Sequence, residues 1–234
     1  SAAILKAGDV SNSGTMSLNG TQVELANVSN SGGNLDITSL TNDIGSVNIT
    51  GNVTNESGNT LINAKDIVIG GTLTNIDGGT VIDGSDSAGS DLEIGAIDVQ
   101  GGTLDLTALV GGVTVNGTVK VTGGSMNIDG ATHSLTANGT IDIDGNFALE
   151  GQETSPPGNV NVMASGDQMF TLTSETGAIN IGGSVLATAN GAHTARLSAE
   201  TITIDGDVTA LGTGNKLIFG GSSDEQLTVK GDMD

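Results

Sequence analysis

The side chains that could do chemistry in this sequence are mainly acidic, and the tightest group lies in one glycine-flanked stretch. Asp83, Asp86 and Asp91 fall within nine residues, around Gly84 and Gly89. Carboxylate oxygens on a flexible loop are suitable ligands for a hard cation such as Ca²⁺. The spacing matches neither an EF-hand nor a glycine-rich calcium-binding repeat. The sequence therefore predicts either a Ca²⁺ site at these three aspartates or a solvated acidic loop, and no other cofactor.

Candidate catalytic residues are few. The chain has one arginine, two histidines, and no cysteine, tryptophan or tyrosine. His193 and Arg196 are close in sequence, but no carboxylate or nucleophile is placed beside them. Sugar-binding grooves generally need aromatic platforms, whereas the three phenylalanines here are expected in the core or at an end of the fold. We therefore expect no catalytic residues and no enzyme activity. The residues considered are His133, His193, Arg196, Phe147, Phe170 and Phe219.

The charge balance excludes several classes of partner. Acidic residues number 27 against 6 basic ones, giving a net charge of −21. Such a surface disfavours nucleic acid and anionic lipid, and no apolar run is long enough for a membrane helix.

The opening Ser1-Ala2-Ala3 suits cleavage after a signal peptide. We expect an extracellular or cell-surface protein without membrane insertion.

A short motif, in which two apolar residues flank a polar one before a glycine, recurs through the chain. A clear copy is Val47-Asn48-Ile49-Thr50-Gly51. Because glycine can adopt φ > 0, each copy predicts a short strand ending at a corner. Repeats of this length are typical of a solenoid, whose coils bury their apolar faces only when they stack. Ten copies begin at residues 23, 47, 67, 92, 113, 135, 160, 179, 202 and 227.

Asparagine recurs at a second fixed position, in Asn12, Asn30, Asn55 and Asn75. Stacked asparagines can form a ladder in which each side-chain amide bonds to the next one. The alternative is a series of ordinary turns, since asparagine tolerates the left-handed region. The marker fades after Asn75, and the pairs that replace it are Gly101-Gly102, Gly123-Gly124 and Gly145-Asn146.

A third apolar segment, as in residues 58–64, completes a unit of three strands and three corners. We therefore predict one all-β domain over 1–234: a three-sided, right-handed parallel β-helix of about ten rungs. Rungs are expected over 9–231, after an apolar segment at 1–8, with surface loops at 83–90 and 151–158. The predicted inward residues are Ile49, Ile69, Ile94, Val115, Ile143, Ile181, Ile204 and Val229.

Two short segments of the chain resemble sequence motifs of a known family. Val53-Thr54-Asn55 and Ile179-Asn180-Ile181-Gly182-Gly183 are similar to phrases in filamentous-haemagglutinin-type adhesins and related secreted β-helical proteins, and the resemblance covers about residues 9 to 231. It implies a right-handed β-helix, secretion, and a role in adhesion or surface structure.

These observations favour an extracellular structural protein whose subunits join head to tail into a surface or biofilm-matrix filament. Its partners would be further copies of itself and a host or neighbouring-cell surface. Open end coils leave backbone groups unpaired and apolar residues uncovered. The alternatives are a stalk or passenger segment of a secreted bacterial adhesin and a carbohydrate-active β-helix enzyme. The expected subunit contacts are Ala2, Ala3, Ile4, Leu5, Leu227 and Val229.

Overall fold

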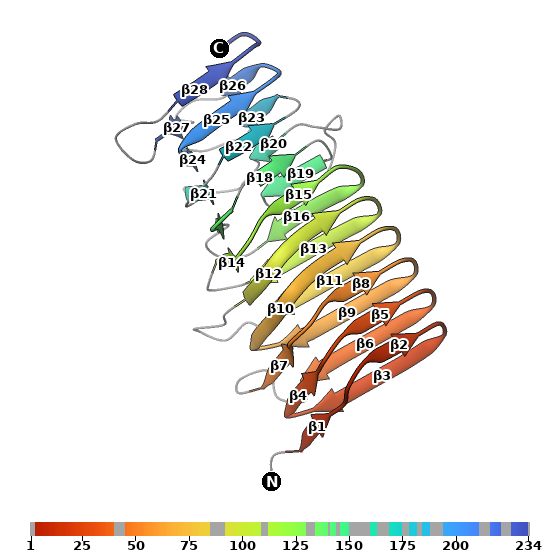
Figure 1. Cartoon of the computed structure of the whole chain (residues 1–234). Coiled ribbons are helices and arrows are strands. Elements are labelled where there is room, and N and C mark those ends of the chain that lie inside the picture. Colours follow the sequence, from red (N-terminus) through yellow and green to blue (C-terminus); the bar gives the residue numbers. More distant parts are fainter. Residues whose placement is uncertain are drawn as a thin grey trace.

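The structure is a computed structural model, in which short parallel strands stack along one axis with the two termini at opposite ends (Figure 1). All regular elements in the described part of the chain are β-strands. The described residues are 3–39, 45–84, 92–108, 112–129, 134–139, 141–143, 146–149, 160–162, 169–174, 178–181, 184–187, 194–210, 216–220 and 226–233.

The strands form three faces, and within each face every strand pairs in parallel with the next coil. The first face contains β1 (Ile4–Lys6), β4 (Gln22–Leu25), β7 (Ser46–Ile49), the first halves of β10 (Asp66–Asn75) and β12 (Leu92–Val99), β14 (Val113–Val115), β17 (Ser134–Ala137), β21 (Met169–Ser174), β24 (Thr194–Ser198) and β27 (Lys216–Phe219). The second face contains β2 (Val10–Asn12), β5 (Val28–Asn30), β8 (Val53–Asn55), the second halves of β10 and β12, β15 (Val119–Val121), β18 (Ile141–Ile143), β22 (Ala178–Ile181), β25 (Thr201–Ile204) and β28 (Gln226–Val229).

The third face is a separate sheet. It contains β3 (Thr15–Gly20), β6 (Asn34–Ser39), β9 (Asn59–Ala64), β11 (Gly79–Gly84), β13 (Thr103–Ala108), β16 (Ser125–Asp129), β19 (Asn146–Leu149), β20 (Val160–Val162), β23 (Val185–Ala187) and β26 (Val208–Ala210). The predicted three-sided parallel solenoid is therefore confirmed.

The coils are regular up to β19 and then change order. From β1 to β19 the chain makes seven turns, each with one strand or half-strand per face. Beyond that point β20 adds a strand to the third face between β19 and β23, while the first and second faces pass directly from β17 to β21 and from β18 to β22. The predicted ten rungs are thus an approximate number. The predicted loops at 83–90 and 151–158 lie mostly outside the described residues.

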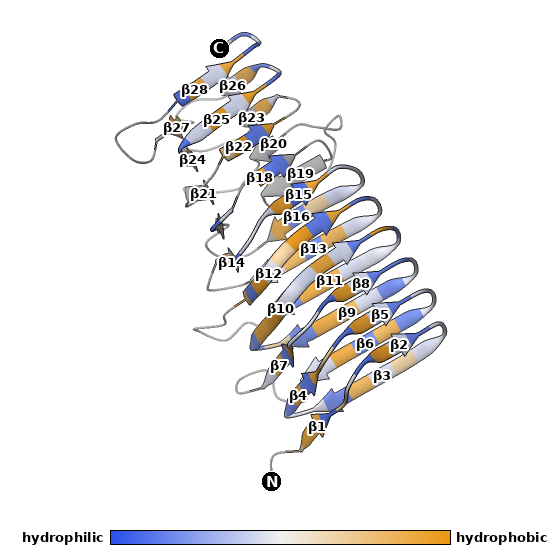
Figure 2. Ribbon diagram, viewed as in Figure 1, coloured by the Kyte–Doolittle hydropathy of each residue, from blue (hydrophilic) through white to orange (hydrophobic). Residues whose placement is uncertain are grey.

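A single apolar core runs along the axis. Alternate residues point inward, so hydrophobic and hydrophilic positions alternate along the strands in Figure 2. Ile49, Ile69 and Ile94, which are in register on the first face, are fully buried. The other predicted inward residues are also buried where described, except Val229, which is half-buried in the last coil; the side chain of Ile143 lies outside the described part.

The ten copies of the recurring motif do not share one column. Copies from Val23 to Leu135 lie on the first face, whereas Val160 lies on the third. The last three copies, from Ile179 onward, lie on the second face. All three faces need the same apolar, polar, apolar alternation, so the motif does not identify the face.

The glycines with positive φ occur at a different corner from the one predicted. In the described residues they are Gly33, Gly58, Gly78, Gly102 and Gly124, with φ from 66° to 85°, between the second and third faces. Glycines that end the first-face strands are needed for close packing instead. A Cβ at Gly70 would lie 2.7 Å from the Thr50 carbonyl oxygen, and one at Gly117 would lie 2.8 Å from that of Gly95.

Candidate functional site

The predicted metal ligands are only partly within the described structure. Asp83 is half-buried near the end of β11, and its carboxylate accepts a 2.6 Å hydrogen bond from Asn63 Nδ2 of the preceding coil. Asp86 and Asp91 lie outside the described residues. Among the residues that are described, no three His, Cys, Asp or Glu side chains form a group able to hold a metal ion. The Ca²⁺ site therefore remains a prediction.

The residues considered for catalysis are not brought together in the described structure. Arg196 is exposed on β24 of the first face, whereas His133 and His193 lie outside the described residues. Phe219 packs at the C-terminal end of the core, in agreement with its expected end-stacking role. The side chains of Phe147 and Phe170 lie outside the described part.

The predicted asparagine ladder is present inside the second face. Asn12 Nδ2 donates to Asn30 Oδ1 at 2.9 Å, and the same bond links the next two pairs at 3.2 and 3.1 Å. Asn30, Asn55 and Asn75 are fully buried. Each amide also bonds to backbone carbonyls of the adjoining corner, as Asn55 does to Gly58 and Gly79. The ladder therefore satisfies buried polar groups where the chain turns toward the third face.

Two threonines on the third face support this ladder, and the sequence pattern did not single them out. Thr60 Oγ1 accepts from Asn30 Nδ2 at 3.1 Å, and Thr80 Oγ1 donates to Asn75 Oδ1 at 2.8 Å. Their signal in the sequence is a hydroxyl at an inward strand position. In the next coil Val99 follows Asn75 and Leu104 follows Thr80, so both partners become apolar together. Because the asparagine and threonine positions change together, the last rung of the ladder, Asn75 with Thr80, leaves neither hydrogen-bonding partner without the other.

Replacing Asn55 by Ala is expected to lower the free energy of unfolding by about 2 kcal/mol, because the carbonyls of Gly58 and Gly79 lose a buried donor. Asn30 and Asn75 keep their bonds to Thr60 and Thr80, which limits the loss. Urea denaturation followed by circular dichroism would measure it. The control is Thr54→Ala, an outward-facing neighbour on β8. Equal midpoints for the two variants would contradict a stabilising ladder.

The N-terminal end of the stack exposes part of the core. Leu5, Met16 and Leu18, from strands of the first coil, are only partly buried although they pack on the hydrophobic core. Among the expected contact residues, Ile4 is 52% exposed and belongs to β1, which pairs with β4 of the next coil. The carbonyl of Ala3 accepts from Thr21 N at 2.7 Å. Ala2 lies outside the described residues.

The C-terminal end has the same character. Leu217, Phe219 and Val229 are partly buried and pack on the core, and Leu227 is 43% exposed. Met233 forms an isolated parallel bridge with Val208 and is 60% exposed. Within the described part of the chain, partial burial of hydrophobic residues against the core is thus a property of the two ends. Sequence analysis identified Leu227 and Val229 as contact residues and expected Phe219 in the core or at an end of the fold, but it missed Leu217 and Met233.

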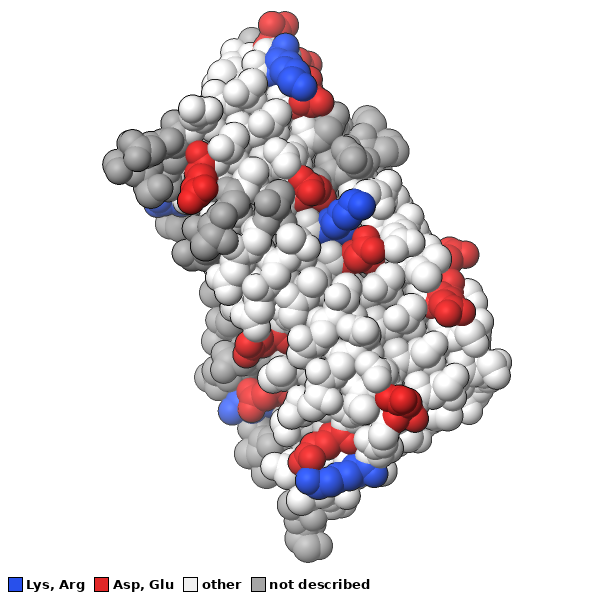
Figure 3. Space-filling model, in the orientation of Figure 1, with Lys and Arg blue, Asp and Glu red and all other residues white. Residues whose placement is uncertain are grey.

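The outward surface is acidic, and its few basic side chains lie beside acidic ones (Figure 3). Lys6 pairs with Glu24 at 2.7 Å, and Lys230 pairs with Asp205 at 2.8 Å. Such exposed pairs contribute little to stability. They leave most carboxylates without a basic partner, since the chain carries 27 acidic and 6 basic residues.

Among the described residues, the structure contains no helix with the length and apolar character needed to span a membrane. A scan of protein-family models and searches of curated proteins and of solved structures find no match to this chain. The residues and their geometry therefore carry the functional argument alone.

Proposed function

We propose that this chain is an extracellular structural protein whose β-solenoid subunits associate end to end into a surface or matrix filament. The observation that carries the proposal is the pair of end coils, where apolar core residues are only partly covered. Each end also presents strands with one unpaired edge, which is a template for further parallel pairing.

The two ends are complementary if the strand register simply continues. Leu5 would then follow Phe219 on the first face, Val10 would follow Leu227 on the second, and Met16 would follow Met233 on the third. Apolar residues meet at all three positions. A contact between unlike ends, repeated by translation along the axis, does not close and therefore produces a fibre.

The test blocks one end at a time with a charge that stacking would bury. Met16→Lys modifies the N-terminal end, and Val229→Lys modifies the C-terminal end. Each variant is expected to weaken self-association about tenfold or more, because the new ammonium would be desolvated without a partner. Ser17→Lys and Thr228→Lys are the controls, since these neighbours face outward on the same strands. Sedimentation velocity in moderate salt, which screens repulsion between acidic rods, would measure association.

Mixing the two end-blocked variants makes the test specific for end-to-end contact. Each variant keeps one free end, so the mixture should form pairs of twice the 23.0 kDa chain mass and no longer species. Wild-type protein that remains as single rods in electron micrographs would contradict the filament. That result would favour the stalk of an adhesin, in which further coils of one polypeptide cover both ends. Cell fractionation tests the extracellular location separately.

A further inference from the structure

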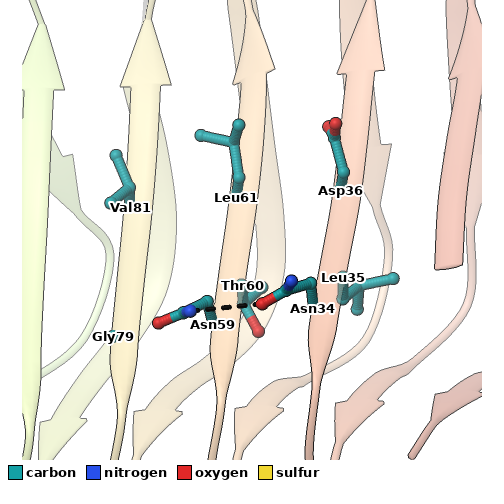
Figure 4. A pocket seen from close by; sticks show the side chains of 8 residues that line it. All are labelled: Asn34, Leu35, Asp36, Asn59, Thr60, Leu61, Gly79 and Val81. Carbon is teal, nitrogen blue, oxygen red and sulfur yellow. Dashed lines mark hydrogen bonds between the residues drawn. The ribbon is translucent and has the colours of Figure 1, made fainter. Parts of the chain in front are cut away.

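A groove of about 360 Å³ lies on the outer surface of the third face. Figure 4 shows two rows of outward side chains across β6, β9 and β11: Asp36, Leu61 and Val81 form one row, and Asn34, Asn59 and Gly79 form the other. The groove is mainly apolar because Leu61 and Val81 form its wall on a surface that is otherwise polar. Its axis crosses the strands, so it runs along the solenoid.

The groove opens at Gly79, where the row of side chains is interrupted. Asn59 Nδ2 donates to Asn34 Oδ1 at 3.2 Å, and a third amide at Gly79 would extend this outer ladder. Instead, Asn59 Oδ1 lies 3.2 Å from the position that a Cβ of Gly79 would occupy. An acceptor oxygen is therefore aimed into the open space beside Val81.

A carboxylate stands at each end of the apolar row. The register runs from Asp36 to Leu61, Val81 and then Asp105 on β13. Strand spacing puts the two carboxylates about 14 Å apart. Asp36 accepts from the Thr38 hydroxyl, and Asp105 accepts from Asn127 Nδ2 at 2.6 Å. Each carboxylate retains further acceptor capacity.

We propose that this groove binds a linear aliphatic polyamine. One terminal ammonium would pair with Asp36 and the other with Asp105, while the methylene chain lies along Leu61 and Val81. An inner nitrogen of the chain would donate to Asn59 Oδ1 at the Gly79 gap. The polar groups assigned to the ligand are all acceptors, and a chain of net charge −21 favours a cation. A polyamine supplies donors, positive charge and apolar stem in the required order.

The probe is spermidine, measured by isothermal titration calorimetry against 1,8-diaminooctane. Both ligands have terminal amines on chains of equal length, but the second has a methylene in place of the inner nitrogen. We expect one spermidine per chain and affinity about tenfold above that of the diamine, since the inner charged donor meets Asn59. Equal affinities would contradict the contact between the inner nitrogen and Asn59. Several equivalent sites per chain would overturn the proposal in favour of general attraction of the more highly charged ligand to an acidic surface.

Gly79→Asn is the decisive variant, because it fills the gap and leaves the net charge unchanged. It should weaken spermidine binding about tenfold or more without changing the melting temperature. Asp36→Asn should weaken it to a similar degree by removing one ionic partner. Asp98→Asn, on the second face, is the charge-matched control and should leave binding unchanged. Equal losses for Asp36→Asn and Asp98→Asn, or normal binding by Gly79→Asn, would each contradict a groove-specific site.

Discussion

Replacing Ile69 by Asp is expected to lower the free energy of unfolding by about 4 kcal/mol or more, because it buries a carboxylate without a partner. Ile69 is fully buried on β10, with Ile49 and Ile94 in register in the coils on either side. Neither neighbour can hydrogen-bond to a carboxylate. Each coil also depends on its neighbours for stability, so damage at this position weakens contacts in both directions.

Val68→Asp provides a matched control for this prediction. Val68 is the preceding residue of the same strand, but it points outward and is 37% exposed. Its neighbours in register are Asn48 and Glu93, so the new charge stays hydrated and meets only weak repulsion. Thermal and urea denaturation should show a large loss for Ile69→Asp and a change within about 0.5 kcal/mol for Val68→Asp. Similar losses would mean that the inward assignment is wrong.

The sequence predicted which residues face inward much better than which face they occupy. Apolar residues alternate with a polar one at Val47 and Ile49, because every second residue of a strand must be buried. Their inward orientation could therefore be predicted from the sequence alone. The same requirement applies to all three faces, which hid the transfer of the motif from Leu135 on the first face to Ile179 on the second. Face identity depends on which coil each strand meets, and that is a long-range property.

The groove on the third face could not be predicted from the apolar pattern. The pair Leu61-Ile62 has no clear alternation, and only one of the two can face the core. The asparagine ladder favours one arrangement, because Thr60 turned inward lets its hydroxyl accept a 3.1 Å hydrogen bond from Asn30 Nδ2. With Thr60 turned inward, Ile62 shares its side and Leu61 must point outward. The apolar wall of the groove therefore lies on the side of β9 opposite to the residues that pack inside with the ladder.

Replacing Gly78 by Ala is expected to cost about 3 kcal/mol or more, since two independent features require glycine there. Its φ is 80°, a left-handed conformation that costs an L side chain roughly 1–2 kcal/mol. Its Cβ would overlap the carbonyl oxygen of Gly58 in the coil below and lie 2.7 Å from the Gly58 nitrogen. Relief of this clash would separate the coils and strain the 2.9 Å bond from Gly79 N to Gly58 O.

The neighbouring substitution Gly79→Ala distinguishes this close packing from a general loss of flexibility. Gly79 starts β11 and is not among the positive-φ glycines of the described chain. The nearest atom to its Cβ would be Asn59 Oδ1 at 3.2 Å, the end of an exposed side chain that can move aside. We therefore expect Gly79→Ala to change stability by less than about 1 kcal/mol, and reduced freedom of the unfolded chain would favour the variant. Equal melting temperatures for Gly78→Ala and Gly79→Ala would contradict the stacked left-handed corner, in which Gly58, Gly78 and Gly102 approach too closely for any side chain.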